Sequence, residues 1–258
     1  MVTTYTVAQH AKSPRGPQKE QSGGLAVLKE IAIIVISALV LSFLIKTFLV
    51  QSFYIPSASM EDTLITGDRV MVSRLTPGVF DLKRGDIVVF VDPGGWLPPY
   101  MAPDRGPVGN AITTGLTAVG LLPSDTGEHL IKRVIGLPGD HVVCDDECAN
   151  DGGPVQVNDV AIDESVYVKP TNTPSGGKPF DEVVPDDMLF VMGDHRQDSA
   201  DSRFNTSKPG GGFVPVHNVV GVCFSTVWPL DRIEWHSNPG SVFEDVPDTA
   251  GSVPQPSA

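Results

Sequence analysis

The chain has 258 residues, of which 18 are Lys or Arg and 31 are Asp or Glu, so its formal net charge is −13. This acidic balance excludes a sequence-independent nucleic-acid binder, because such a protein needs a basic surface to displace counterions. The 26 Gly and 23 Pro residues predict many turns, and three Cys residues are too few for a scaffold built from disulfides.

An apolar stretch near the N-terminus predicts a membrane anchor. Ile31 to Ile45 contains no charge, and Ile31–Val50 has the 20 residues that a bilayer-spanning helix needs. A buried core helix and a cleaved signal peptide are the alternatives, but no small-x-small cleavage site follows. Basic residues precede the stretch, so the N-terminus is expected in the cytoplasm. We therefore expect a disordered cytoplasmic tail over 1–23 and a transmembrane helix over 24–50.

Beyond the anchor, short β-branched runs alternate with turn residues, at 69–73, 87–91, 130–135, 141–144, 155–157, 188–192, 219–228 and 232–235. This spacing is typical of antiparallel sheets, and it predicts a mainly β fold preceded by one N-terminal transmembrane helix. Asn158-Asp159 is predicted as the turn of a hairpin. We expect one extracytoplasmic β domain over 51–236, containing a hairpin subdomain at about 141–186.

Two segments differ in composition from this pattern. Residues 92–126 form a long insertion, with a short helix expected around Ala111–Leu121, and loops of this length are usually functional or mobile. Residues 237–258 are rich in Pro, Ser and acidic residues, and we expect them to be a disordered tail. From residue 47 onward there are 13 basic and 29 acidic residues, so the outer part carries about −16.

The cysteines do not indicate a metal centre. Cys144 and Cys148 lie four residues apart just past a predicted strand, where a small loop disulfide is the natural interpretation outside a membrane. Metal binding is less favoured, because no second pair or nearby His would complete the ligand set. Cys223 lies in an apolar run and is expected to be buried. No metal or other cofactor is expected.

Common catalytic motifs are absent from the sequence, which has no G-x-S-x-G, H-E-x-x-H, P-loop or G-x-G-x-x-G. His195 lies near Ser199 and Asp201, but a triad within one short loop has no particular support, and a structural His is the better interpretation. Three other segments combine reactive and turn residues, and they are Ile55–Leu64, His129–Asp140 and Met192–Arg203.

Together these segments resemble bacterial type I signal peptidases, also called leader peptidases. The patterns P-S-x-S-M, K-R-V-x-G-x-P-G-D and G-D-x-R-x-x-S-x-D-S-R occur in this order after the apolar stretch. The resemblance, which extends from about Ile31 to Trp228, implies a serine endopeptidase in the bacterial cell membrane, with its catalytic domain on the outer face. Its partners would be the lipid bilayer and signal-peptide-bearing preproteins, cut after an Ala-x-Ala-like site. Asp62 and His195 depart from the common family pattern.

The resemblance also implies site residues. Ser59 would be the nucleophile and Lys132 the general base, with Ser57 and the Ser59 N–H as oxyanion donors. Three further residues would support the site. Ser199 would position the lysine, and Asp201 and Arg203 would support the site around it. A substrate pocket or lipid contact is expected from apolar residues near these positions, namely Phe53, Ile55, Pro56, Met60, Leu64 and Ile131.

Elementary chemistry supports this assignment independently of the resemblance. A serine hydroxyl needs an adjacent base, and a lysine can act as one when burial lowers its pKa from about 10.4. In a strand Leu130, Lys132 and Val134 share a face while Arg133 points to the other. If Pro56–Met60 is extended, Ser57 and Ser59 face the same side.

Two alternatives to a signal peptidase would need different sequence features. A self-cleaving Ser/Lys regulatory protease would carry a DNA-reading domain and have no anchor. This sequence predicts an anchor and no DNA-reading domain. A membrane-tethered, non-catalytic substrate-binding domain would not need Ser59, Lys132 and Ser199 together. The sequence does not predict the oligomeric state.

Overall fold

The computed structural model describes residues 23–98, 106, 109, 129–169 and 173–249. Much of the predicted insertion at 92–126, including its expected short helix, and the predicted tail at 1–23, except Gly23, lie outside these residues. The chain divides into two compact units, Met1–Ser42 and Phe43–Ala258, each of which is described separately.

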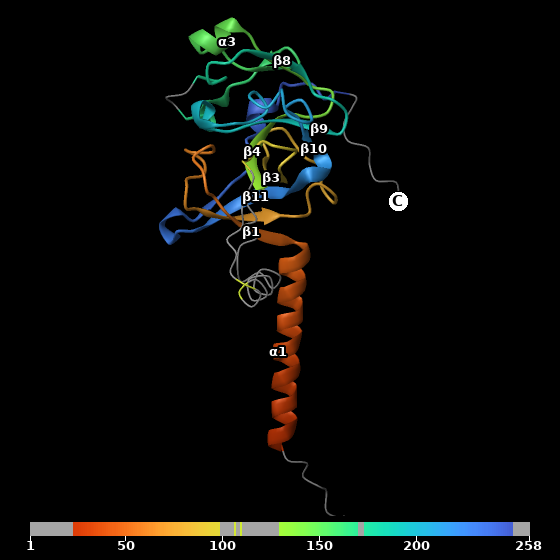
Figure 1. Cartoon of the computed structure of the whole chain (residues 1–258). Helices are drawn as coiled ribbons and strands as arrows, with labels where there is room; N and C mark the ends of the chain where they lie inside the picture. The colour runs from red at the N-terminus through yellow and green to blue at the C-terminus, as the bar shows by residue number, and fades with distance from the viewer. Residues whose placement is uncertain (1–22, 99–105, 107–108, 110–128, 170–172, 250–258) are drawn as a thin grey trace, which may run out of the picture. The chain divides into compact units, whose positions relative to one another are not determined.

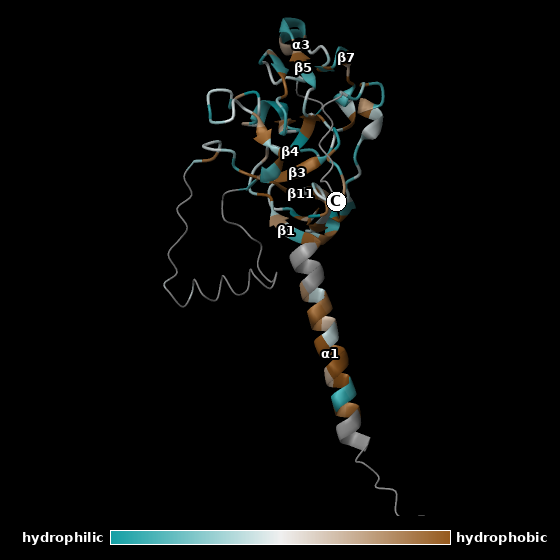
Figure 2. Ribbon diagram, turned by 90° about the vertical axis from the view of Figure 1, so that its right-hand side faces the viewer, coloured by the Kyte–Doolittle hydropathy of each residue, from teal (hydrophilic) through white to brown (hydrophobic). Residues whose placement is uncertain are grey.

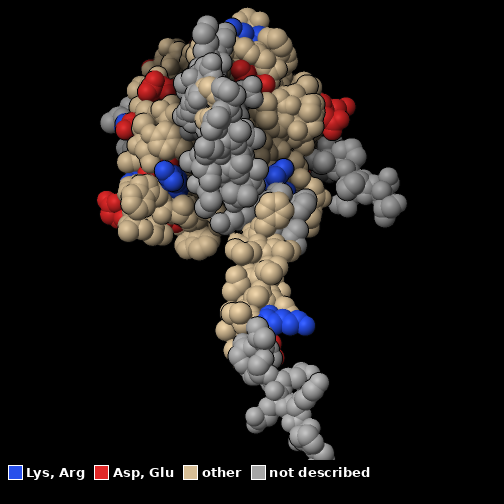
Figure 3. Space-filling model, turned by 60° about the horizontal axis from the view of Figure 1, so that its bottom comes forward, with Lys and Arg blue, Asp and Glu red and all other residues tan. Residues whose placement is uncertain are grey.

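The predicted anchor region forms helix α1, Gly23–Phe48. The helix is predominantly hydrophobic (Figure 2), and in Figure 3 most of its described surface is uncharged. Within the described part of the chain, no helix is both long and apolar enough to cross a membrane. The side chains described in α1 are those of residues 27–43, which include Lys29 and Glu30 and are fewer than the roughly 20 that a bilayer requires. The predicted transmembrane helix is therefore not confirmed.

The second unit contains two antiparallel sheets, which agrees with the predicted mainly β class. The larger has the strand order β1-β2-β11-β3-β4-β9-β10, with β12 paired to β11, and the smaller has the order β7-β6-β5-β8. The smaller sheet and helix α3 lie at one end of the domain, beyond β4 (Figures 1 and 2). The larger sheet consists of β1 (Val50–Tyr54), β2 (Arg69–Ser73), β3 (Ile87–Val91), β4 (His129–Gly136), β9 (Met188–Met192), β10 (Val214–Pro215), β11 (Val219–Trp228) and β12 (Glu234–Trp235).

The smaller sheet is built around the predicted hairpin. Its elements are β5 (His141–Cys144), α3 (Asp146–Asp151), β6 (Gln156–Val157), β7 (Val160–Ala161) and β8 (Phe180–Val183). Val157 pairs with Val160, and the turn residues Asn158 and Asp159 have φ of 51° and 65°, as a two-residue turn of type I′ requires. The hairpin turn is thus confirmed. Short 3₁₀ turns occur at Glu164–Val166, Arg196–Asp198, Val216–Asn218, Leu230–Arg232 and Gly240–Phe243.

Strand β3 lies at the centre of the larger sheet and is buried on both faces. Ile87 and Val89 belong to one apolar cluster, and Val88 and Phe90 to another. Alternation along a strand explains this division, since successive side chains point to opposite faces. β4 pairs with β3 and is buried along almost its whole length, so a charged side chain on β4 is removed from water.

The C-terminal segment corrects one prediction. Residues 237–258 were expected to be disordered, but 237–249 are described and fold against the domain. Phe243 and Val246 are buried in the apolar cluster of the smaller sheet. Asn238 Nδ2 donates to Asp86 Oδ1 at 2.6 Å. Two buried apolar side chains outweigh the polar composition around them, which the prediction had followed.

Candidate active site

The loop between β1 and β2 holds Ser59. The backbone of Ile55 and Asp68 closes the loop, because the Ile55 N–H donates to the Asp68 carbonyl at 2.9 Å. Met60 and Leu64 are completely buried in the core and are joined by a 2.7 Å hydrogen bond from the Leu64 N–H to the Met60 carbonyl. Met60, the residue directly after Ser59, is therefore anchored in the core, and this limits the movement of the loop that carries the Ser59 hydroxyl.

This loop corrects two predictions. Pro56–Met60 is not extended, because the chain bends at Ser57 and turns from Ser59 onward, with the Glu61 N–H donating to the Ala58 carbonyl at 2.9 Å. Met60 and Leu64 are completely buried, and Phe53 and Ile55 are 5% and 1% exposed, so none of these four side chains is accessible to lipid. Their apolar character serves the core of the sheet.

Lys132 lies on β4 and meets Ser59 across 73 positions of sequence. Its Nζ is 2.6 Å from Ser59 Oγ, and the two residues are only 4% and 6% exposed. Burial lowers the pKa of Lys132 from 10.5 to about 8, against the opposing charges of Asp201 and Asp194. At pH 7 a group with this pKa is neutral in roughly one molecule in ten, which makes it a usable base.

The neighbouring Arg133 is held away from this pair. Its guanidinium binds both carboxylate oxygens of Asp194, at 2.8 and 2.6 Å, and stacks over the ring of Tyr167 with its Cζ 4.1 Å from the centroid. Thr63 Oγ1 donates to the same carboxylate at 2.6 Å. Asp194 therefore ties the Ser59 loop to β4. Sequence reasoning did not assign Asp194 a role, although it lies inside the third motif.

Asp201 organises the segment after β9. It is completely buried and accepts hydrogen bonds from Ser199 Oγ at 2.7 Å and from the Gly193 N–H at 2.9 Å. Arg203 binds both of its oxygens, at 2.8 and 2.6 Å. Burial opposes the ionised carboxylate, but these partners lower the pKa of Asp201 overall. The hydroxyl of Ser199 thus donates to Asp201, and its predicted role in positioning Lys132 stays a prediction.

Gly193 lies where this segment packs closely against the nucleophile loop. A Cβ at this position would overlap the side chain of Ser199 and the carbonyl oxygen of Ser59. Only a glycine allows the two segments to approach this closely. Sequence reasoning did not single out Gly193, and its place at the start of the G-D-x-R-x-x-S-x-D-S-R pattern was the available signal.

Ser57 lies on the open side of Ser59. Ser57 is exposed, and its Oγ is 3.4 Å from Ser59 Oγ. The Ser59 N–H has no hydrogen-bond acceptor within the described part of the chain, so it can donate to a bound group. A hydroxyl and a free N–H thus lie next to the Ser59 hydroxyl, and an oxyanion site requires hydrogen-bond donors close to the nucleophile.

A small cavity of about 110 Å³ opens beside this pair. Four of the predicted pocket residues line it, together with both site residues Ser57 and Lys132. Its lining residues are Phe53, Tyr54, Ile55, Pro56, Ser57, Val89, Leu97, His129, Leu130, Ile131 and Lys132. Most of its lining residues are apolar, which suits an apolar side chain.

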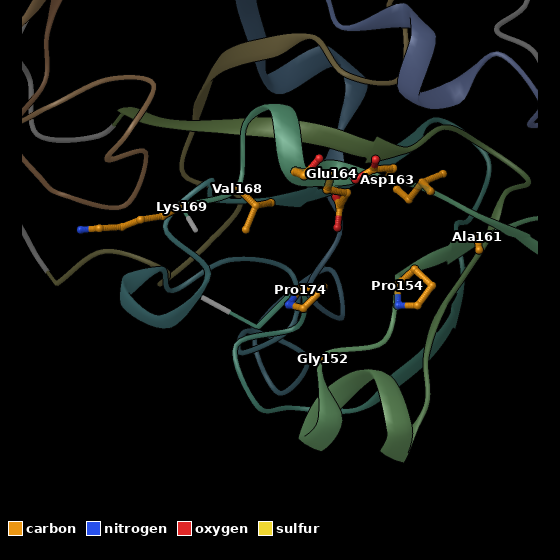
Figure 4. A pocket seen from close by; sticks show the side chains of 10 residues that line it. Gly152, Pro154, Ala161, Asp163, Glu164, Val168, Lys169 and Pro174 are labelled. Carbon is orange, nitrogen blue, oxygen red and sulfur yellow. Dashed lines mark hydrogen bonds between the residues drawn. The ribbon is translucent and has the colours of Figure 1, made fainter. Parts of the chain in front are cut away.

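A second, larger hollow of about 750 Å³ lies in the region of the smaller sheet (Figure 4). None of the predicted site residues lines it. In Figure 4 the side chain of Lys169 extends away from this hollow, and its Nζ lies 2.7 Å from Glu61 Oε2. Glu164 on its wall is paired with Arg196 at 2.6 Å. Nearby, Cys144 and Cys148 are joined by a disulfide that fastens α3 to β5.

A serine hydroxyl next to a buried lysine, beside free oxyanion donors on a β scaffold, has the chemistry of a Ser/Lys hydrolase. Residues 28–228 match the family model described as "Signal peptidase, peptidase S26". The chain belongs to this family.

Two curated relatives agree with the family match. The chain is 34% identical to a "Probable signal peptidase I" of Mycobacterium leprae (strain TN), over 88% of this chain and 83% of that protein. It is also 34% identical to a "Signal peptidase I" of Mycobacterium tuberculosis (strain CDC 1551 / Oshkosh), over 80% of this chain and 74% of that protein. A crystal structure of a signal peptidase I from Enterococcus faecalis V583 is 24% identical, with a TM-score of 0.33, covering 55% of this chain and 97% of that one.

Proposed function

We propose that this protein removes signal peptides from exported preproteins, with Ser59 as nucleophile and Lys132 as general base. The observation that carries the assignment is the 2.6 Å contact between Lys132 Nζ and Ser59 Oγ inside a buried site. As a member of the signal peptidase family, the protein is a serine endopeptidase. The residue roles rest on the geometry and on the three sequence motifs.

In the acylation step, neutral Lys132 takes the proton of Ser59 Oγ as this oxygen attacks the carbonyl carbon of the scissile peptide bond. The resulting oxyanion accepts hydrogen bonds from the Ser57 hydroxyl and the Ser59 N–H. When the carbon–nitrogen bond breaks, the protonated Lys132 gives its proton to the leaving amine, which becomes the new N-terminus of the exported chain. The signal peptide stays bound to Ser59 as an ester.

In the deacylation step, the same lysine takes a proton from a water molecule as the water oxygen attacks the ester carbon. The bond from this carbon to Ser59 Oγ then breaks, Lys132 returns the proton to Ser59 Oγ, and the signal peptide leaves with a free carboxyl terminus. Asp201, Ser199 and Arg203 do not react in this scheme. They hold Gly193 against the nucleophile loop, and the 2.9 Å bond from the Gly193 N–H to Asp201 supports this role. The charge of Asp201 also limits how far burial lowers the pKa of Lys132.

The small cavity is the proposed site for a substrate side chain. Because about 110 Å³ is available beside Ser57 and Lys132, side chains of the size of Ala fit there, as cleavage after a small-x-small site requires. Strand β1 pairs with β2 alone among the described strands, and in this proposal an extended substrate adds along its other edge.

We further propose that α1 anchors the enzyme in the cell membrane, with the β domain on the outer face. The support comes from the uncharged sequence Ile31–Ile45 and from the exposure of its large apolar side chains, such as Ile34 at 67% and Leu39 at 64%. Exposed apolar surface of this extent needs a lipid or protein cover. Membrane fractionation with alkaline carbonate tests this, and release of the intact protein into the soluble fraction would contradict it.

The cleavage assay uses the full chain in detergent with a preprotein that carries an Ala-x-Ala site. The wild type is expected to cut after this site, and Ser59→Ala and Lys132→Met are expected to lose at least about 10³-fold in kcat. Ser237→Ala and Lys208→Met change the same residue types at exposed positions and serve as matched controls. Equal cleavage by either site variant would refute the dyad, whereas failure of the wild type on all preproteins would favour a non-catalytic binding domain.

A further inference from the structure

His195 contacts the backbone on both sides of the proposed nucleophile. Its N–H donates to the Ser59 carbonyl at 3.1 Å, and its ring Nδ1 lies 3.2 Å from the Ala58 carbonyl oxygen. The ring is largely buried, with 16% of its side chain exposed. The ring nitrogen therefore has a specific backbone partner in the nucleophile loop.

The Ala58 carbonyl has a direct geometric link to the oxyanion site. It shares one planar trans peptide group with the Ser59 N–H, so the two point in opposite directions. Any group that holds the Ala58 oxygen therefore sets the direction of the Ser59 N–H. This oxygen accepts from the Glu61 N–H at 2.9 Å, and its second lone pair faces His195.

The ion pair between Glu61 and Lys169 favours a proton on Nδ1 of His195, which the contact with the Ala58 carbonyl needs. To donate to Ala58, the imidazole must carry a proton on Nδ1. Glu61 Oε2 lies 3.3 Å from the same nitrogen, and Lys169 holds that carboxylate at 2.7 Å. A carboxylate beside Nδ1 stabilises the tautomer with its proton there.

We propose that His195 is a positioning residue, which aims the Ser59 N–H into the oxyanion site by holding the Ala58 carbonyl. This inference rests on the proposed function, because it assigns the Ser59 N–H to the oxyanion. His195 does not exchange protons with the substrate in this role.

The test compares two replacements of similar shape. His195→Asn keeps an N–H donor at the atom position of Nδ1, whereas His195→Leu puts a methyl group there. Both leave the backbone bond to Ser59 in place. His217→Leu and His217→Asn, at an exposed position, are the matched controls. The measurements are kcat and KM for a preprotein, thermal unfolding, and the affinity for a peptide aldehyde, whose adduct with the serine carries the oxyanion.

His195→Leu is expected to lower kcat by about 10- to 100-fold and to weaken aldehyde binding by about tenfold or more, while KM changes by less than about threefold. His195→Asn is expected to stay within about threefold of the wild type in kcat, in KM and in aldehyde affinity. If the leucine variant fails to fold, His195→Gln, which moves the donor one atom farther, carries the same prediction.

A wild-type kcat in the leucine variant, with Ser59→Ala inactive, would overturn the inference and leave the proposed function standing. Equal losses in the Asn and Leu variants would also overturn it, since packing rather than the hydrogen bond would then be responsible. Full activity of Ser59→Ala would overturn the proposed function and the inference with it.

Discussion

Replacing Lys132 with Met is expected to abolish cleavage and, at neutral pH, to stabilise the folded protein. The wild type buries an ammonium group that is only 4% exposed, and the folded state loses stability by holding this charge away from water. Methionine fills a similar volume without a charge. Activity and stability should therefore change in opposite directions in this variant.

The size of the effect follows from the pKa of Lys132, which is about 8 in the folded protein and 10.5 ordinarily. Below pH 8 the lysine is protonated in both states. Between pH 8 and 10.5 it is neutral when folded but protonated when unfolded, so the unfolded state binds more protons and stability rises with pH. The difference between the two pKa values corresponds to about 3 kcal/mol of folding stability that the wild type loses below pH 8. The methionine variant has no such group and does not lose it.

The assay is urea unfolding of the wild type and Lys132→Met at several pH values from 7 to 10.5, followed by tryptophan fluorescence. Trp96 is 8% exposed and reports on the apolar cluster next to β4. The stability advantage of the variant should shrink by about 3 kcal/mol across this range. Titrations common to both proteins cancel in the difference. A difference that stays constant with pH would refute the reasoning.

Three other outcomes are expected. In the wild type, kcat/KM should rise about tenfold per pH unit below 8 and level off above it, because the buried lysine acts when neutral; a flat profile from pH 6 to 9 would contradict a lysine base. Gly193→Ala should lower kcat at least about tenfold and reduce stability by about 1–3 kcal/mol, since its Cβ overlaps Ser199 and the Ser59 carbonyl; wild-type activity would exclude this close approach. Asp201→Asn should cost about 3–5 kcal/mol in urea unfolding, because the Arg203 charge is left buried without its partner; a loss below about 1 kcal/mol would contradict the network.

The central strands could be predicted because their own residues determine them. The predicted runs at 69–73, 87–91, 141–144 and 188–192 coincide with β2, β3, β5 and β9. Three strands were not predicted, β1 (VQSFY), β8 (FDEV) and β10 (VP), whose sequences contain polar residues or Pro. They are strands because a neighbouring strand supplies backbone partners, and a short sequence window does not contain that information.

The site was predictable as a set of residue types but not as a set of contacts. The motifs point to Ser59 and Lys132, and alternation along β4 predicts that Arg133 lies apart from the lysine. The burial of Met60 in the core and the bond from His195 to Ala58 depend on packing between distant segments. For the same reason, Phe243 was expected in a disordered tail although it is buried.

The separation of 73 positions between Ser59 and Lys132 has a consequence for the life of the molecule in the cell. While the sheet is still unformed, the lysine is in water, where its pKa is the ordinary 10.5 and roughly one side chain in 3,000 is neutral at pH 7. The hydroxyl then has no base near it, and the nascent chain cannot cleave itself or its neighbours. On the proposed mechanism, the protease therefore becomes active only when the fold brings Lys132 to the Ser59 hydroxyl.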